Sequence, residues 1–251
     1  ILTTVLLAED RPNIIFLLTD DHRQSDLGCY GSPIVKTPHI DQLAAEGVLF
    51  ETASRSSASC KPSRTSYFLG QFERRHGVNF NSGTSVSLSA WAHSYPVLLR
   101  ESGYFTGYVG KNHAPVGAHG YETGVMEKTF DFWYAGHGHI RFYPKEVHEI
   151  FRNAKNETQV ELVGEGVSEF LRAESPSYLG GAEEFLAARP KGQPFCLSIC
   201  LNVPHGAGTS SMKLLPSDDE LYRTAYRDQI DTLTLPPNYI ARSELETPKL
   251  P

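Results

Sequence analysis

The stretch Asn13-Ile14-Ile15-Phe16-Leu17-Leu18-Thr19-Asp20-Asp21 decides the fold class of this chain. Its apolar run is continuous and rich in residues that favour β-strands. Such a run is typical of a strand in a parallel sheet, which helices cover on both faces. The run ends at two adjacent carboxylates, where the strand would reach its carboxyl end. The segment therefore predicts a buried strand followed by a polar site.

Further segments along the chain alternate between strand and helix patterns. Additional strands are predicted at residues 48–50, 104–109 and 195–201, and helices at residues 38–46, 62–69, 95–102 and 182–188. Residues 116–178 are rich in Gly, His and aromatic residues, and we expect loops and insertions there. The alternation predicts an α/β fold, with a largely parallel central sheet flanked by helices.

The composition is that of a globular protein able to bury a core. The 251 residues include 40% hydrophobic residues, and 23 Lys+Arg against 29 Asp+Glu give a net charge of −6. This mild acidity, without a long basic run, argues against nucleic acid as the main partner. No apolar run approaches the roughly 20 residues of a membrane span. Four cysteines in so long a chain do not form a disulfide framework.

Both ends of the sequence carry signals of processing or truncation. Residues 1–8 are apolar and end on a small residue before charges, which resembles the remnant of a secretory signal peptide, although an N-terminal strand reads similarly. The remnant would indicate a secreted or periplasmic protein, or a lysosomal one in a eukaryote. Residues 235–251 are proline-rich and irregular, so we expect the chain to be a piece of a longer protein.

Reactive side chains occur at or just after three predicted strands. They are Asp20 and Asp21, Lys111 and His113, and His205. Ligands of open α/β sheets bind at the carboxyl ends of the strands, so these groups could meet in one crevice. Paired carboxylates suit a hard cation such as Ca²⁺ or Mg²⁺, although an Asp-Asp pair is also common in solvated turns and helix caps.

A second candidate site is Cys60-Lys61-Pro62-Ser63-Arg64. Pro62 suits the first turn of a helix, which places Cys60 at or just before the helix N-terminus. The free N–H groups there favour an anion, and Arg64 adds a forked cation that suits sulfate or phosphate. A cysteine in such surroundings is usually reactive, whereas a lone cysteine is usually a small buried hydrophobe.

Together these segments resemble the sulfatase family. The five ordered motifs are residues 11–21, residues 26–31 with 37–44, Cys60 to Gly70 with the pattern Cys-x-Pro-Ser-Arg, Gly110-Lys111-Asn112-His113, and Asn202 to Gly206 with its Pro-His pair. The resemblance is dense over residues 11–115 and 194–206. Leu69 and Asn112 depart from the family pattern, which usually has Thr and Trp there. These departures could alter recognition by the modifying enzyme or the shape of the pocket.

The resemblance implies an alkaline-phosphatase-like fold and hydrolysis of a sulfate ester, on a sulfated carbohydrate or an aryl sulfate. Residues 11–251 would be the N-terminal part of the catalytic domain, without its C-terminal part and small subdomain. Two alternatives remain open: a phosphonate or phosphate monoester hydrolase of the same superfamily, and an inactive truncated or binding relative.

The resemblance also implies a cofactor set. Cys60 would be oxidised to formylglycine, by a formylglycine-generating enzyme or an anaerobic sulfatase-maturing enzyme. Ca²⁺, or alternatively Mg²⁺, would be bound by Asp20, Asp21 and the modified Cys60. Ca²⁺ takes about six to eight oxygens, more than these residues supply, so further ligands are expected outside the chain.

The resemblance also implies roles for the remaining motif residues. Arg64 and Lys111 would stabilise charge on the nucleophile and the sulfuryl group. His113 would be the base for release of sulfate. His205 would contact the sulfate or protonate the leaving alcohol, and Lys111 would also bind substrate.

Overall fold

A computed structural model describes residues 11–79, 84–118, 124–138, 142–144, 159–163, 166–168 and 177–205, with residues 228, 240 and 244. The expected signal-peptide remnant at residues 1–8 lies outside this range, as does most of the proline-rich segment 235–251. The chain divides into a larger unit, residues 1–23 and 50–217, and a smaller one, residues 24–49 and 218–251.

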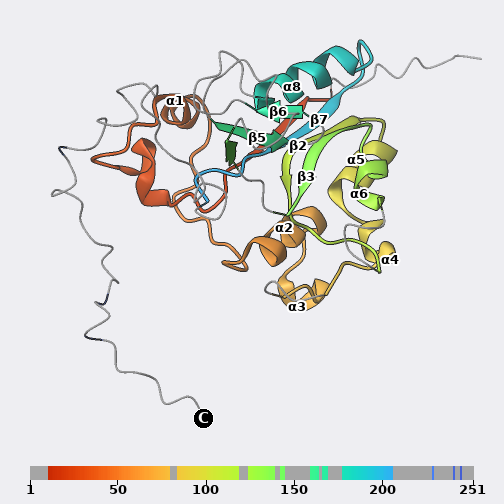
Figure 1. Cartoon of the computed structure of the whole chain (residues 1–251), viewed down its shortest axis with the longest axis horizontal. Coiled ribbons are helices and arrows are strands. Elements are labelled where there is room, and N and C mark those ends of the chain that lie inside the picture. Colours follow the sequence, from red (N-terminus) through yellow and green to blue (C-terminus); the bar gives the residue numbers. More distant parts are fainter. Residues whose placement is uncertain are drawn as a thin grey trace, which may run out of the picture. The chain divides into compact units, whose positions relative to one another are not determined.

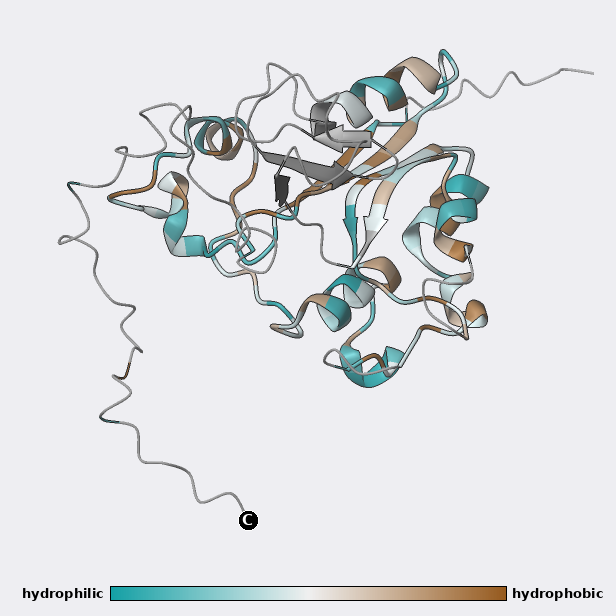
Figure 2. Ribbon diagram, viewed as in Figure 1, coloured by the Kyte–Doolittle hydropathy of each residue, from teal (hydrophilic) through white to brown (hydrophobic). Residues whose placement is uncertain are grey.

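A parallel four-stranded sheet forms the centre of the larger unit (Figure 1). The strand order is β1 (Ile14–Leu18), β7 (Phe195–Cys200), β2 (Phe105–Asn112) and β3 (Phe132–His137). The predicted strands at 13–19, 104–109 and 195–201 are therefore confirmed, as is the α/β fold. Figure 2 shows hydrophobic residues along β1 and β7, whereas β2 and β3 become more hydrophilic toward their carboxyl ends.

The described residues of the larger unit form six helices. They are α2 (Cys60–Leu69), α3 (Glu73–His76), α4 (Leu88–Trp91), α5 (Tyr95–Glu101), α6 (Val125–Thr129) and α8 (Ser177–Ala188). Figure 1 shows α8 on one side of β2 and β7, with α5 and α6 on the other. Consecutive residues of β2 enter the two cores: Tyr108 packs with Phe68, whereas Val109 packs with Phe185. No helix of the described residues is long and apolar enough to cross a membrane.

The β1 strand lies at one edge of this sheet and is only partly covered, so the prediction of a strand buried on both faces was wrong. Phe16 packs on Tyr67 of α2, with ring centroids 5.1 Å apart. Ile15 and Leu17 point to the other face, where they remain 63% and 53% exposed. Within the described residues, β1 pairs only with β7. The strand that carries the two carboxylates at its end therefore has one open side.

The segment 116–178 contains more regular structure than expected. It supplies α6 and the edge strand β3, and a separate antiparallel sheet forms from β4 (Phe142–Pro144), β5 (Gln159–Val163) and β6 (Gly166–Ser168). The expectation of loops and insertions missed β3, although its residues Phe132, Trp133 and Tyr134 favour strands and pair in register with β2.

The smaller unit contains η1 (Gln24–Asp26), η2 (Gly28–Tyr30) and α1 (Pro38–Glu46). The predicted helix is confirmed, with Pro38 in its first turn. Two side chains of this segment stabilise the preceding turn. Thr37 accepts a hydrogen bond from the N–H of Gly28 at 2.8 Å, and Asp41 accepts one from the N–H of Cys29 at 2.7 Å. The strand predicted at residues 48–50 was wrong: these residues are irregular and exposed, so three apolar residues did not indicate a buried strand.

The packing of α8 against β2 depends on a glycine. A Cβ atom at Gly107 would lie 2.3 Å from Cδ2 of the buried Phe185 ring. We expect Gly107→Ala to lower the free energy of unfolding by about 1–3 kcal/mol, the usual cost of overpacking. Gly180→Ala is the control, because no atom lies within 4 Å of its added Cβ and alanine favours the helix. Urea unfolding checks both variants, and equal stabilities would contradict the prediction.

Candidate functional site

The ends of three parallel strands bring the predicted residues together. Asp20 follows β1, Lys111 is the penultimate residue of β2, and His205 follows β7. The segments after β1 and β7 are joined by backbone hydrogen bonds, from the N–H of Leu201 to the carbonyl of Leu18 at 2.8 Å and from Asp20 to Val203 at 3.1 Å. The predicted meeting of these residues at one end of the sheet is therefore observed for Asp20, Lys111 and His205.

Asp21 has an unusual backbone conformation. Its φ of +56° lies in the left-handed region, which residues with a Cβ rarely adopt. Two adjacent side chains of a strand point to opposite faces, but this turn lets both carboxylates reach the same place. The Oδ2 atom of Asp21 lies 3.4 Å from Nε2 of His205. The left-handed backbone conformation of Asp21 therefore allows its carboxylate to lie beside His205 and close to Asp20.

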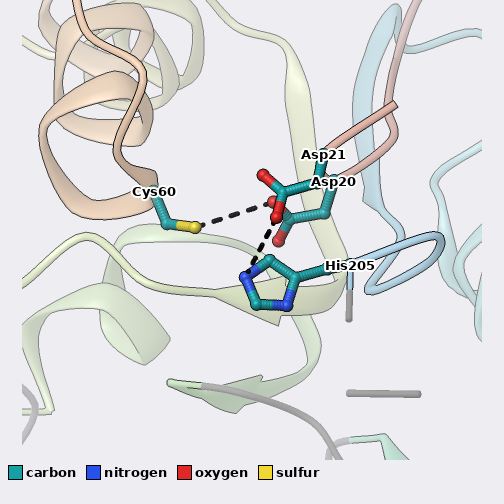
Figure 3. A group of neighbouring side chains, drawn as sticks. All are labelled: Asp20, Asp21, Cys60 and His205. Carbon is teal, nitrogen blue, oxygen red and sulfur yellow. Dashed lines mark hydrogen bonds and ion pairs between the residues drawn. The ribbon is translucent and has the colours of Figure 1, made fainter. Parts of the chain in front are cut away.

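Cys60 joins the same cluster from helix α2, of which it is the first residue. Its Sγ lies 3.7 Å from Oδ1 of Asp20 (Figure 3). The potential ligand atoms of Asp20, Asp21, Cys60 and His205 all lie within 4.8 Å of one another. Burial, aided by the negative charge of Asp20, raises the pKa of the Cys60 thiol above its usual value, despite Lys111 and Arg64 nearby. The unmodified thiol is consequently protonated at neutral pH and a poor nucleophile, contrary to the expectation from the helix N-terminus.

Asp20 is held by two buried cations. Its Oδ2 lies 3.1 Å from Nη2 of Arg64 and also accepts a hydrogen bond from Nζ of Lys111. The side chains of Asp20, Arg64 and Lys111 are 6%, 3% and 0% exposed. Burial disfavours the ionised carboxyl, but Arg64 and Lys111 outweigh it and hold the pKa of Asp20 below its usual value. With Asp21 in the same cluster, these two cations face two carboxylates and the formal charges balance, so a bound divalent cation would supply the positive charge that attracts an anion.

These residues open onto the surface. A small hollow at the cluster is lined by nine residues: Leu18, Thr19, Asp20, Asp21, Arg55, Ala58, Cys60, Ser63 and Arg64. Leu18, Arg55 and Ser63 also line a neighbouring pocket of about 380 Å³. A ligand at the cluster could therefore extend past Arg55 and Ser63.

Comparison with known proteins identifies the family. Residues 12–242 match the family model described as Sulfatase. The chain belongs to the sulfatase family. Among curated sulfatases, the N-acetylglucosamine-6-O-sulfatase of Bacteroides thetaiotaomicron is 29% identical over 196 residues, which cover 78% of this chain and 31% of that protein. The human N-acetylgalactosamine-6-sulfatase is 28% identical over 246 residues, covering 90% of this chain and 46% of that protein.

Solved structures show the same fold. The crystal structure of Ps i-CgsB in complex with k-i-k-neocarrahexaose has a TM-score of 0.60 and 27% identity, and the match covers 78% of this chain and 46% of that one. The chain thus spans about a third to a half of the length of these relatives. The alkaline-phosphatase-like α/β fold expected from the sequence is confirmed.

The cluster of Asp20, Asp21, Cys60 and His205 contains donor atoms that suit a hard divalent cation only in part. The carboxylates of Asp20 and Asp21 are ligands that Ca²⁺ and Mg²⁺ prefer, and the turn at Asp21 directs both to one place. The Cys60 sulfur is a soft donor, whereas an oxygen-bearing formylglycine at the same position would match the carboxylates. The residues therefore fit such a cation once Cys60 is modified.

The two histidines differ in their placement. His205 belongs to the four-residue cluster, although the sequence assigned it only to the substrate. Its Pro-His motif was visible in the sequence and placed it in the same crevice as Asp21, but the sequence did not indicate their direct contact. His113 is buried two residues after Lys111 and is not a member of that cluster within the described residues. The role of His113 as a base stays a prediction.

Proposed function

We propose that the full-length protein hydrolyses sulfate esters, with a formylglycine made from Cys60 as the nucleophile. The observation that carries this proposal is the contact of Cys60 with Asp20, at the carboxylate that Arg64 and Lys111 also bind. The family membership supports a sulfuric ester hydrolase. Relatives named for 6-sulfated amino sugars support a sulfated carbohydrate as the substrate, with an aryl sulfate as the alternative.

The proposal includes a cation and further residues. Asp20, Asp21 and the modified Cys60 would hold the cation, and Ca²⁺ suits them best, with Mg²⁺ as the alternative. Residues 11–251 would form the N-terminal part of the catalytic domain, and the remaining ligands would come from outside them. A formylglycine-generating or anaerobic sulfatase-maturing enzyme would act on Cys60. This maturation and the signal-like residues 1–8 suit a secreted or periplasmic protein, or a lysosomal one in a eukaryote.

The chemistry divides between the modified residue, the cation and the surrounding side chains. Hydrated formylglycine supplies two hydroxyls on one carbon, so that one can attack the sulfur and the other can later drive release of sulfate. The bound cation supplies positive charge that polarises the sulfate. Arg64 and Lys111 would add their charge where negative charge develops. His113 would accept the proton for sulfate release, and His205 would contact the sulfate or protonate the leaving alcohol.

Two measurements test the proposal. The full-length protein, expressed with a maturing enzyme, is digested, and the peptide that contains residue 60 is examined by mass spectrometry for the aldehyde. Hydrolysis rates are then measured on matched aryl sulfate, phosphate and phosphonate esters. The proposal requires the aldehyde and a preference for the sulfate ester. An intact thiol without sulfate turnover would contradict it, and faster phosphonate or phosphate turnover would assign the site to that alternative reaction.

Arg64 provides a prediction within this reaction. We expect Arg64→Ala to lower kcat on a sulfate ester by about 10²–10³, because a charge partner of the transition state is lost. The fraction of aldehyde at residue 60 is measured in the same sample, so that failed maturation is not mistaken for slow chemistry. Arg100→Ala is the control, since Arg100 is an exposed arginine paired with Asp131. Equal rates for fully matured Arg64→Ala and the wild type would refute the role of Arg64.

A further inference from the structure

The carbonyl of Lys111 is held by side chains. The pairing of β2 with β7 ends at Gly110, whose φ of +99° turns the chain out of the extended conformation. The next carbonyl along β2, that of Lys111, accepts a hydrogen bond from the Tyr108 hydroxyl at 2.8 Å and another from Nη1 of Arg64 at 2.7 Å. The carbonyl oxygen of Lys111 thus links the Tyr108 hydroxyl to the backbone of Lys111 and to the guanidinium of Arg64, the two residues whose side chains bind Asp20.

The ring of Tyr108 is fixed on several sides. It is fully buried and stacks on Trp133, with ring centroids 5.3 Å apart and an interplanar angle of 17°. The ring centroids of Phe130 and Phe68 lie 5.2 and 5.9 Å from the centroid of the Tyr108 ring. Burial also raises the pKa of Tyr108 well above its usual value, so the hydroxyl keeps its proton and can donate. The aromatic core therefore determines where this donor lies.

We propose that the Tyr108 hydroxyl is a positioning group for the reaction. It fixes the backbone of Lys111, which keeps the Lys111 ammonium and the Arg64 guanidinium at Asp20, beside Cys60. Tyr108 itself does not need to touch the substrate. This inference rests on the proposed function, because it assigns Tyr108 to the two cations that would face the sulfate group.

The test removes a single oxygen atom. Tyr108→Phe keeps the ring and its packing but loses the donor to Lys111. The matched control is Tyr95→Phe, which also loses a buried tyrosine hydroxyl, one that lies 2.6 Å from Oγ of Ser198. In the matured full-length enzyme, we expect Tyr108→Phe to lower kcat about three- to tenfold, as for one hydrogen bond, with a smaller change in KM. Tyr95→Phe should leave kcat within about twofold, although both variants lose similar stability in urea.

A double-mutant cycle separates positioning from general loss of stability. If Tyr108 acts through these two cations, adding Tyr108→Phe to Lys111→Ala should lower kcat by less than in the wild-type background, because only its effect on Arg64, through the carbonyl that alanine retains, is left. A full, additive loss in that background would overturn the inference, and so would equal kcat values for the Tyr108→Phe and Tyr95→Phe enzymes.

Binding of inorganic sulfate, measured by calorimetry on the same proteins, provides a readout that does not require turnover. Tyr108→Phe should weaken sulfate binding about three- to tenfold relative to Tyr95→Phe, on the same hydrogen-bond scale. A wild-type enzyme without activity on sulfate esters would refute the proposed function. The sulfate-binding comparison would still decide the inference in that case, since equal affinities of the two variants would overturn it.

Discussion

Cys60→Ala should reduce kcat on a sulfate ester by about 10⁴ or more in the full-length enzyme, as expected when a covalent nucleophile is removed. Alanine cannot be oxidised to an aldehyde, so the variant lacks both hydroxyls that the proposed reaction uses. The rest of the cluster stays in place, because Asp20 keeps its contacts with Arg64 and Lys111. Steady-state kinetics at saturating substrate measures the loss.

Cys196→Ala is the matched control for this experiment. Cys196 is a buried thiol in β7, and burial raises its pKa to about 11. It lies toward the start of that strand, whereas the candidate site lies beyond the strand's end. Activity within about threefold of the wild type is expected for Cys196→Ala, after allowance for a small cavity. Comparable loss in both variants, or activity that survives in Cys60→Ala, would remove Cys60 from the mechanism.

Asp20→Asn should have the largest effect on stability. The change leaves Arg64 and Lys111 buried without their anion, and breaking such a buried pair typically costs about 3–5 kcal/mol. The control is Asp131→Asn, at the more exposed pair with Arg100, where the two side chains are 20% and 47% exposed. Such a pair contributes about 1 kcal/mol or less, and the hydrogen bond that Asp131 Oδ2 accepts from the N–H of Thr106 adds about 1 kcal/mol, so a smaller loss than for Asp20→Asn is expected. Urea unfolding at neutral pH measures the difference between the two variants.

The pH dependence of the Asp20 effect has a definite sign. The folded-state pKa of Asp20 is lowered, so its contribution is present above the unfolded-state pKa and lost as the pH falls through the folded-state value. The gap between wild type and Asp20→Asn should therefore close in acid. Calorimetric titration with Ca²⁺ should also show weaker binding by this variant than by Asp131→Asn. Equal stability at neutral pH together with unchanged Ca²⁺ affinity would contradict both roles of Asp20.

Local sequence signals were sufficient for the main elements. The uninterrupted apolar run of β7 specifies a buried strand, and Pro62 marks the start of α2, which begins at Cys60. The similar run of β1 indicates a strand but not its place at the sheet edge, where Ile15 and Leu17 are exposed. The edge strand β3 was missed because it lies in a segment rich in Gly and His, although its own residues Phe132, Trp133 and Tyr134 favour strands. A pattern within one segment therefore indicates that a strand forms there, whereas the place of that strand in the sheet depends on neighbouring strands far away in the sequence.

The site residues could be nominated from the sequence, but their connections could not. Asp20 and Lys111 are 91 residues apart, and no periodicity indicates that they share a hydrogen bond. The sequence assigned Arg64 and Lys111 to the nucleophile and the sulfuryl group, whereas the fold also places both on Asp20. Tyr108 gave no signal, because an aromatic residue within a strand suits an ordinary core position. Long-range electrostatic contacts depend on the completed sheet.

The uncovered side of β1 has a practical consequence. Among the described residues, β1 pairs on one side alone and exposes Ile15 and Leu17, and such an outer strand is a template for another strand. A preparation of these 251 residues alone would therefore tend to aggregate through this edge. Poor solubility of such a preparation would result from the exposed edge of β1 rather than from misfolding of the hydrophobic core.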